Sequence, residues 1–259
     1  MKSSEASPER VYRNPPVVEA LCEVHFAPED WDEGIPSKLY EKIKEDFPKQ
    51  QLREFREAHV TVSENDETAT TTVKELPNWT VFLTESQDRL IQISETILTF
   101  NQLQPYRPFS EWKEQFFNTF SLFKDLAPSR RIENVDVRYI NRIEIPAGEI
   151  DLEHYFLIKP TLPAGCGETL GPFLMKVTIP QPDDTNILMV TFQSTRQDEA
   201  SDEIQPFVLD LHIRILIDEK AERVDIENLV EDAHSRIIRA FEGSITDNLR
   251  ELFDSGDKV

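Results

Sequence analysis

Three stretches of this sequence alternate between apolar and polar residues, and they constrain its fold more than any other feature. They are residues 18–26, 135–145 and 206–217. Successive side chains of a β-strand point to opposite faces of its sheet, so a period of two predicts strands with one buried and one polar face. Asn14-Pro15-Pro16 precedes the first stretch, where a strand needs no backbone donor.

A period near 3.6 residues predicts helices in three other segments. These are residues 38–47, residues 111–126 behind an N-cap at Ser110, and a long final helix over about 225–253. Residues 150–157 are typical of a short helix or a turn. Further short strands are expected at 52–62, 69–75, 79–84, 88–100, 171–179 and 186–194, with a break in segment 88–100 at Ser94-Glu95.

The order of these elements indicates an α+β fold with an internal duplication. Each half reads strand, short helix, antiparallel strands, long helix, which resembles a helix-grip or TATA-binding-protein-like arrangement. We expect a flexible N-terminus at 1–13, a first half at 14–130 and a second half at 131–259, joined as one compact unit. A chain of 259 residues with 16 phenylalanines has enough apolar material for a sizeable core.

The chain carries 49 acidic and 28 basic residues, a net charge of −21. Phosphate backbones and anionic membrane surfaces repel such a surface, so direct binding to nucleic acid or to a membrane is disfavoured. Basic proteins or cations are the favoured partners, although acidity that only keeps the protein soluble is an equal alternative. The absence of a signal segment, of a disulfide framework and of a long apolar run predicts a cytoplasmic protein without membrane spans.

Motifs of the common enzyme classes are missing from the sequence. It contains no G-x-S-x-G, no Walker loop, no G-x-G-x-x-G and no H-E-x-x-H, and its five histidines stand apart from one another. Cys22 lies in a strand pattern, and Cys166 lies in a Gly-Cys-Gly turn without a motif that would activate a thiol. We therefore expect no catalytic residues, no metal, no cofactor and no enzymatic activity.

One polar cluster is expected on a sheet face. Asp210, His212 and Arg214 point the same way from one strand, and they would make a metal or acid–base site if residues of the first strand faced them. The preferred alternative is a solvated face with modest charge pairing. Arg138 and Arg142 are expected to pair with acidic residues of the first strand. The complete candidate cluster is Glu19, Glu23, Arg138, Arg142, Asp210 and His212, with His25 as a further neighbour.

The acidic stretch Glu29, Asp30, Trp31, Asp32 and Glu33 is the candidate partner-binding site. Aromatic anchors dominate protein interfaces, and acidic neighbours would speed encounter with a basic partner. The alternative is that Trp31 folds back onto the core. The stretch lacks the glycine and the spacing of an EF-hand loop, so a calcium site is not predicted.

Three segments carry a resemblance. They are Y-R-N-P-P-V-V-E-A at 12–20, R-Y-I-N-R-I-E-I-P at 138–146, and A-H-S-R at 233–236 followed by Phe241 and L-R-E-L-F at 249–253. Together they resemble a sporadically distributed family of uncharacterised bacterial and archaeal proteins of about this length. The patchy distribution of that family implies cargo of mobile elements, such as antiviral-defence, CRISPR-accessory or toxin–antitoxin loci. The family has no established enzymatic activity that the resemblance would transfer.

These observations lead to two functional hypotheses. The first is a non-catalytic accessory or neutralising subunit that binds another protein, presumed basic, in such a prokaryotic system. The second is a small-ligand-binding helix-grip module, with a cavity beneath a long helix lined by Trp112, Phe116 and Phe120.

Overall fold

The chain forms a nine-stranded antiparallel sheet with helices packed on one side. The computed structural model describes residues 10–28, 31–53, 56–62, 69–75, 78–146, 151–165, 171–182, 185–194, 204–221 and 223–255, with the backbone alone in 56–62 and 69–75. Within these ranges there are five helices and two antiparallel sheets, which makes the fold α+β as predicted.

The elements follow one another in two runs, each of which opens with a long strand. The first run is β1 (Val17–Phe26), α1 (Ile35–Ile43), β2 (Lys49–Arg53), β3 (Arg56–Val62), β4 (Ala69–Glu75), β5 (Trp79–Leu83), β6 (Arg89–Ile93), β7 (Ile97–Leu103) and α2 (Phe109–Leu126). The second run is β8 (Ile132–Pro146), α3 (Leu152–Tyr155), β9 (Leu174–Pro180), β10 (Asn186–Ser194), β11 (Ile204–Leu216), α4 (Ile226–Glu242) and α5 (Asp247–Asp254).

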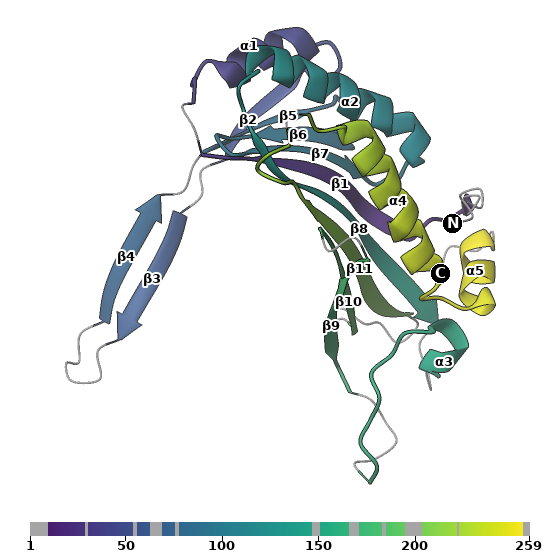
Figure 1. Cartoon of the computed structure of the whole chain (residues 1–259). Coiled ribbons are helices and arrows are strands. Elements are labelled where there is room, and N and C mark those ends of the chain that lie inside the picture. Colours follow the sequence, from purple (N-terminus) through teal and green to yellow (C-terminus); the bar gives the residue numbers. More distant parts are fainter. Residues whose placement is uncertain are drawn as a thin grey trace.

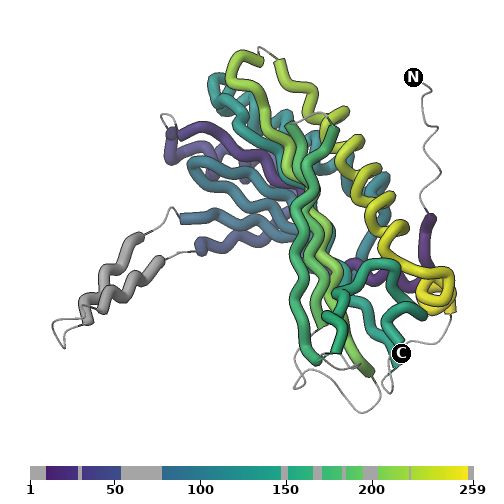
Figure 2. Tube along the Cα trace, turned by 60° about the horizontal axis from the view of Figure 1, so that its bottom comes forward, coloured from purple at the N-terminus to yellow at the C-terminus, as the bar shows by residue number. Residues whose placement is uncertain are grey.

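The large sheet has the strand order β2-β5-β6-β7-β1-β8-β11-β10-β9, so the opening strands of the two runs are neighbours at its centre. Strands β3 and β4 pair with each other in a separate two-stranded sheet. Figure 1 shows α1, α2 and α4 on the same side of the large sheet, and Figure 2 shows the strands of the two runs crossing at a large angle. In the described part of the chain the opposite face carries no helix, and it is called the open face below.

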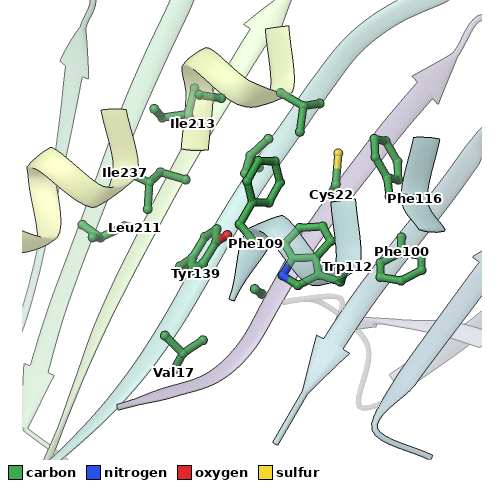
Figure 3. Close-up of a cluster of buried hydrophobic side chains, with 14 of the residues drawn as sticks. Val17, Cys22, Phe100, Phe109, Trp112, Phe116, Tyr139, Leu211, Ile213 and Ile237 are labelled. Carbon is green, nitrogen blue, oxygen red and sulfur yellow. The ribbon is translucent and has the colours of Figure 1, made fainter. Parts of the chain in front are cut away.

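Aromatic side chains fill the space between α2 and the sheet (Figure 3). Trp112 is fully buried; its ring stacks on Phe100 at 5.7 Å and meets the edge of Phe109 at 4.9 Å. Phe116 is 1% exposed and contacts Phe100 in an edge-on arrangement. Burial of such rings is the main source of stability, because removing apolar surface from water contributes about 25 cal/mol per Å². Trp112 and Phe116 are therefore core residues.

The final helix differs from the prediction. Residues 225–253 were expected to form one helix, but α4 ends at Glu242 and α5 begins at Asp247. Between them Ile245 is fully buried and forms a backbone bridge with Phe156, which a continuous helix would not allow. The apolar period continues across the break because α5 also packs onto the core through Leu249 and Phe253.

The start of α2 was also predicted two residues late. The helix begins at Phe109 behind Pro108, and Ser110 lies inside its first turn instead of capping it. Phe109 is 5% exposed and stacks on the buried His234 of α4, with 4.1 Å between ring centroids. That contact favours the earlier start. The predicted break of segment 88–100 at Ser94-Glu95 is confirmed, since β6 ends at Ile93 and β7 begins at Ile97.

Chain segments 10–14 and 253–255 lie against each other. The backbone N–H of Asn14 donates to the carbonyl of Phe253 at 2.8 Å, and Arg10 pairs with Asp254 at 2.8 Å. Tyr12 is 8% exposed, although residues 1–13 were expected to be flexible, and its ring packs edge-on against Phe253 at 5.3 Å. The ordered part of the chain therefore begins before the predicted boundary at residue 14.

None of the helices in the described ranges is both long enough and apolar enough to cross a membrane.

Candidate functional site on the open face

A polar network covers the centre of the open face, where β1, β8 and β11 run side by side. The register places Glu23 of β1 opposite Asp136 of β8, and Asp136 opposite Arg214 of β11. The alternation of each strand sends all three side chains to the face without helices. The central carboxylate is thus reached from both neighbouring strands.

Asp136 is the centre of this network. Its side chain is 3% exposed, and Arg214 contacts both of its carboxylate oxygens, with Nη2 at 2.7 Å from Oδ2 and Nε at 2.9 Å from Oδ1. The Nε2 atoms of His25 and His212 each lie 3.4 Å from Oδ2. Burial alone would raise the pKa of Asp136, but His212, His25 and Arg214 hold that pKa well below its usual range. The carboxylate is therefore ionised.

Glu23 and His25 form the β1 side of the network. Nε2 of His25 lies 2.5 Å from Oε1 of Glu23, and Thr99 of β7 donates to the other oxygen at 2.8 Å. Burial lowers the pKa of His25, but the carboxylates of Asp136 and Glu23 outweigh it and raise that pKa to about 9. Burial acts against ionisation of Glu23, yet His25 and Thr99 lower its pKa below the ordinary value.

The remaining predicted members lie around this centre in a different pairing. Arg138 binds Asp210 through two hydrogen bonds of 2.8 and 2.7 Å, and Arg142 pairs with Glu144 at 2.9 Å. The expectation that these arginines pair with Glu19 or Glu23 is wrong, because the register places Leu21 opposite Arg138. The diagonal neighbour on β11 supplies the carboxylate instead.

Polar contacts extend the network toward the first edge of the sheet. Glu19 accepts a hydrogen bond from Asn101 at 2.5 Å, and Asn101 accepts one from Gln92 at 3.0 Å. Sequence reasoning missed Asp136, Thr99 and Asn101 as members of the site. Asp136 belongs to the alternating stretch 135–145, and the signal that would have found it is its place in register between two histidine-bearing strands.

The network contains no nucleophile next to a base within the described residues, and its ion pairs link β1, β8 and β11. Three of its members have ligand atoms within 4.8 Å of one another and could together hold a metal ion: Glu23, His25 and Asp136.

The acidic stretch is only partly described. Glu29 and Asp30 lie outside the described residues. Trp31 is partly buried and packs against the core, with the guanidinium of Arg130 5.6 Å above its ring. Asp32 accepts hydrogen bonds from the Gly34 backbone at 2.8 Å and from Lys38 at 2.6 Å. Glu33 is exposed. Cys166 also lies outside the described residues, and Cys22 is buried as a free thiol.

A cavity of about 190 Å³ opens beside α4 and not beneath α2. All three segments that carry the family resemblance contribute to its wall, through Tyr12, Pro16, Tyr139, Asn141 and Phe241. Two isoleucines of α4 and the start of α2 complete a mostly apolar lining. Its full set is Arg10, Val11, Tyr12, Arg13, Pro15, Pro16, Val17, Tyr106, Pro108, Tyr139, Asn141, Ile237, Ile238, Phe241 and Glu242.

Comparison with known proteins adds no relative: no protein-family model matches the chain, and no curated protein matches it.

Proposed function

We propose that the chain is a non-catalytic binding protein that takes up an extended segment of another protein along the free edge of β9. The observation that carries this proposal is the exposure of apolar side chains there: Leu174 is 67% exposed, Val177 38% and Ile179 40%. In the described structure β10 is the only strand neighbour of β9. An unprotected apolar edge strand is a template for an added strand.

The chemistry of the partner follows from the same strand. Main-chain hydrogen bonds to β9 would supply affinity, and apolar residues at alternate positions of the partner would meet Val177 and Ile179. The net charge of −21 favours basic residues that flank this segment, because they speed encounter at low salt. The acidic stretch around Trp31 remains a candidate for that steering. Trp31 packs against the core, so replacing it would test stability before binding.

The biological setting rests on the family resemblance. Defence, CRISPR-accessory or toxin–antitoxin loci place partners next to one another in the genome, so products of neighbouring genes are the first partners to test. The finer assignment of the fold as helix-grip or TATA-binding-protein-like is part of this proposal. Its support is the adjacency of β1 and β8 at the centre of the sheet.

The experiment is co-expression of the chain with each neighbouring gene product, followed by light scattering and calorimetry of the purified complex. The double variant Val177→Lys, Ile179→Lys places two cations on the edge, and the matched control Leu52→Lys changes the opposite edge, where Leu52 is 63% exposed. We expect the wild type and the control to form the same complex, and the double variant to bind at least about tenfold more weakly.

Two results would count against this proposal. One is the absence of any complex with a neighbouring product, and the other is a complex that the β9 variant forms as tightly as the wild type. A wild-type homodimer that the variant abolishes would identify a second copy of this chain as the occupant, contrary to the proposal.

A second candidate function is favoured by the cavity beside α4. Its lining is mostly apolar and also includes Arg10, Arg13 and Glu242, and two basic residues beside an apolar wall fit a small apolar acid. Short-chain and aromatic carboxylates should raise the melting temperature more than their neutral amides, because a ligand that binds only the folded state stabilises it. Ile238→Trp would fill the cavity and should remove that difference. Equal shifts for acids and amides, or shifts that persist in the variant, would exclude this function.

A further inference from the structure

Three potential ligand atoms converge on the open face where the two halves of the sheet meet. One ligand atom each of Glu23, His25 and Asp136 lies within 4.8 Å of the other two. Nε2 of His25 is 3.4 Å from Oδ2 of Asp136. Bonds of about 2.0–2.1 Å to a tetrahedral zinc ion would place neighbouring ligand atoms roughly 3.3–3.4 Å apart. The histidine–aspartate spacing therefore suits a shared metal ion without movement of the backbone.

We propose that Glu23, His25 and Asp136 bind a divalent first-row transition-metal ion that joins β1 to β8. One imidazole nitrogen and two carboxylate oxygens form a donor set that suits Zn²⁺, Mn²⁺, Fe²⁺ or Co²⁺ better than Ca²⁺ or Mg²⁺, which prefer oxygen alone. The ion would be structural, and the side of the site that faces solvent would supply water as the remaining ligand.

The contact between Glu23 and His25 supports this assignment. Nε2 of His25 is buried, and neither carboxylate oxygen near it lies in the direction of a ring N–H hydrogen bond. The atoms are close, but they are not aligned as donor and acceptor. An ion bound to both would need Oε1 of Glu23 to move from 2.5 Å to about 3.3 Å from Nε2, which rotation of the carboxylate group can supply.

Groups behind the ligands hold them in place, as is usual at metal sites. Thr99 donates to Oε2 of Glu23 at 2.8 Å, which leaves Oε1 directed toward His25. Arg214 binds both oxygens of Asp136 and fixes the plane of the carboxylate. Each carboxylate oxygen has two lone pairs, so Oδ2 can accept from Arg214 and also contact an ion.

The local charge also favours a cation. Two of the three ligands are carboxylates, whose negative charge an added cation would offset. The acidic surface of the whole chain acts in the same direction, because a net charge of −21 raises the local concentration of cations.

The test is titration of the full-length, chelator-treated protein with ZnCl₂, MnCl₂ and CoCl₂ by calorimetry. CaCl₂ and MgCl₂, whose cations prefer oxygen ligands, are titrated for comparison. The visible spectrum of bound Co²⁺ reports the ligand geometry. We expect one saturable site for at least one transition metal, a higher melting temperature in its presence, and at least about tenfold weaker binding in His25→Asn and in Glu23→Gln.

Asp210→Asn is the matched control, because it removes a carboxylate from the same face outside the ligand set, and its affinity should match the wild type. Glu23→Gln preserves side-chain volume and is expected to fold. If circular dichroism shows that His25→Asn is unfolded, the folded Glu23→Gln variant provides the test. The proposal is overturned if the wild type binds no transition metal saturably, or if the ligand variants bind it as tightly as the control does. Preference for Ca²⁺ or Mg²⁺ would also overturn it.

Discussion

The two halves of the sheet are built alike and covered differently. In the first half the helix that follows the opening strand is α1, with nine residues, and it buries Ile35, Leu39 and Ile43. In the second half the same place in the chain holds α3, with four residues and no buried side chain. Figure 1 shows α1 above the strands of the first half, whereas α3 lies beside α5, away from β9.

This difference determines how well the apolar side chains of the outer strands are buried. Phe82 of β5 is fully buried, and Tyr40 of α1 stacks on its ring at 5.5 Å. Val177 and Ile179 of β9 point to the helix side of the sheet but meet no such helix, so they stay partly exposed. An apolar strand that is left uncovered adds little to the stability of this chain and remains available for another one.

The largest expected effect is a difference in stability loss between a substitution in the first half and one in the second half. Leu39→Ala removes a fully buried side chain from under α1 and should lower the free energy of unfolding by about 2–5 kcal/mol. Ile179→Ala, at a position that is 40% exposed, should cost less than about 1 kcal/mol. Urea denaturation measures both. Similar losses at the two positions would mean that β9 is as well covered as β5.

An intermediate effect concerns the turn between β5 and β6, where Asp88 is 4% exposed and accepts hydrogen bonds from Thr84 and Ser86. Burial opposes ionisation of Asp88, but these hydroxyls lower its pKa below the ordinary value. A lowered pKa stabilises the fold above the unfolded value of about 3.9, and this contribution is lost as pH falls through the folded value.

Asp88→Asn should therefore cost roughly 1–3 kcal/mol at neutral pH and progressively less below about pH 4. Amide hydrogen exchange should show the loss in β5 and β6, with β9 and β10 unchanged. An effect that is the same at pH 3 and pH 7 would refute the role of the ionised carboxylate.

The smallest effect compares the two edges of the sheet. Val177→Lys on β9 and Leu52→Lys on β2 should each change stability by less than about 0.5 kcal/mol. Their effects on self-association at high concentration should differ, because β2 already carries Lys49 and Arg53. Sedimentation velocity should show that only Val177→Lys reduces association. Equal reductions would show that β9 does not promote self-association more than β2 does.

The sequence predicted the strands of the sheet well where one face is buried and the other polar. Alternation identified the buried faces of β1 and β11. It also placed Glu23, His25 and His212 on polar faces. What alternation does not determine is register, and register decides that Asp136, rather than Asp210, lies between the two histidines.

Other features depended on contacts distant in sequence. The break between α4 and α5 follows from the burial of Ile245 against Phe156, which lies 89 positions earlier in the chain. The exposure of β9 depends on the absence of a covering helix, and a strand pattern contains no information about what lies above it. Local periodicity could predict neither feature.

The contact between segments 10–14 and 253–255 has a mechanical consequence. A force applied through these two segments acts first on the Asn14–Phe253 hydrogen bond and the Arg10–Asp254 ion pair, which lie outside the sheet. The hydrogen bonds between β1 and β8 carry load only after these contacts have separated. Stretched in this way, the chain should yield in two steps, with a small extension from α5 before the sheet itself opens.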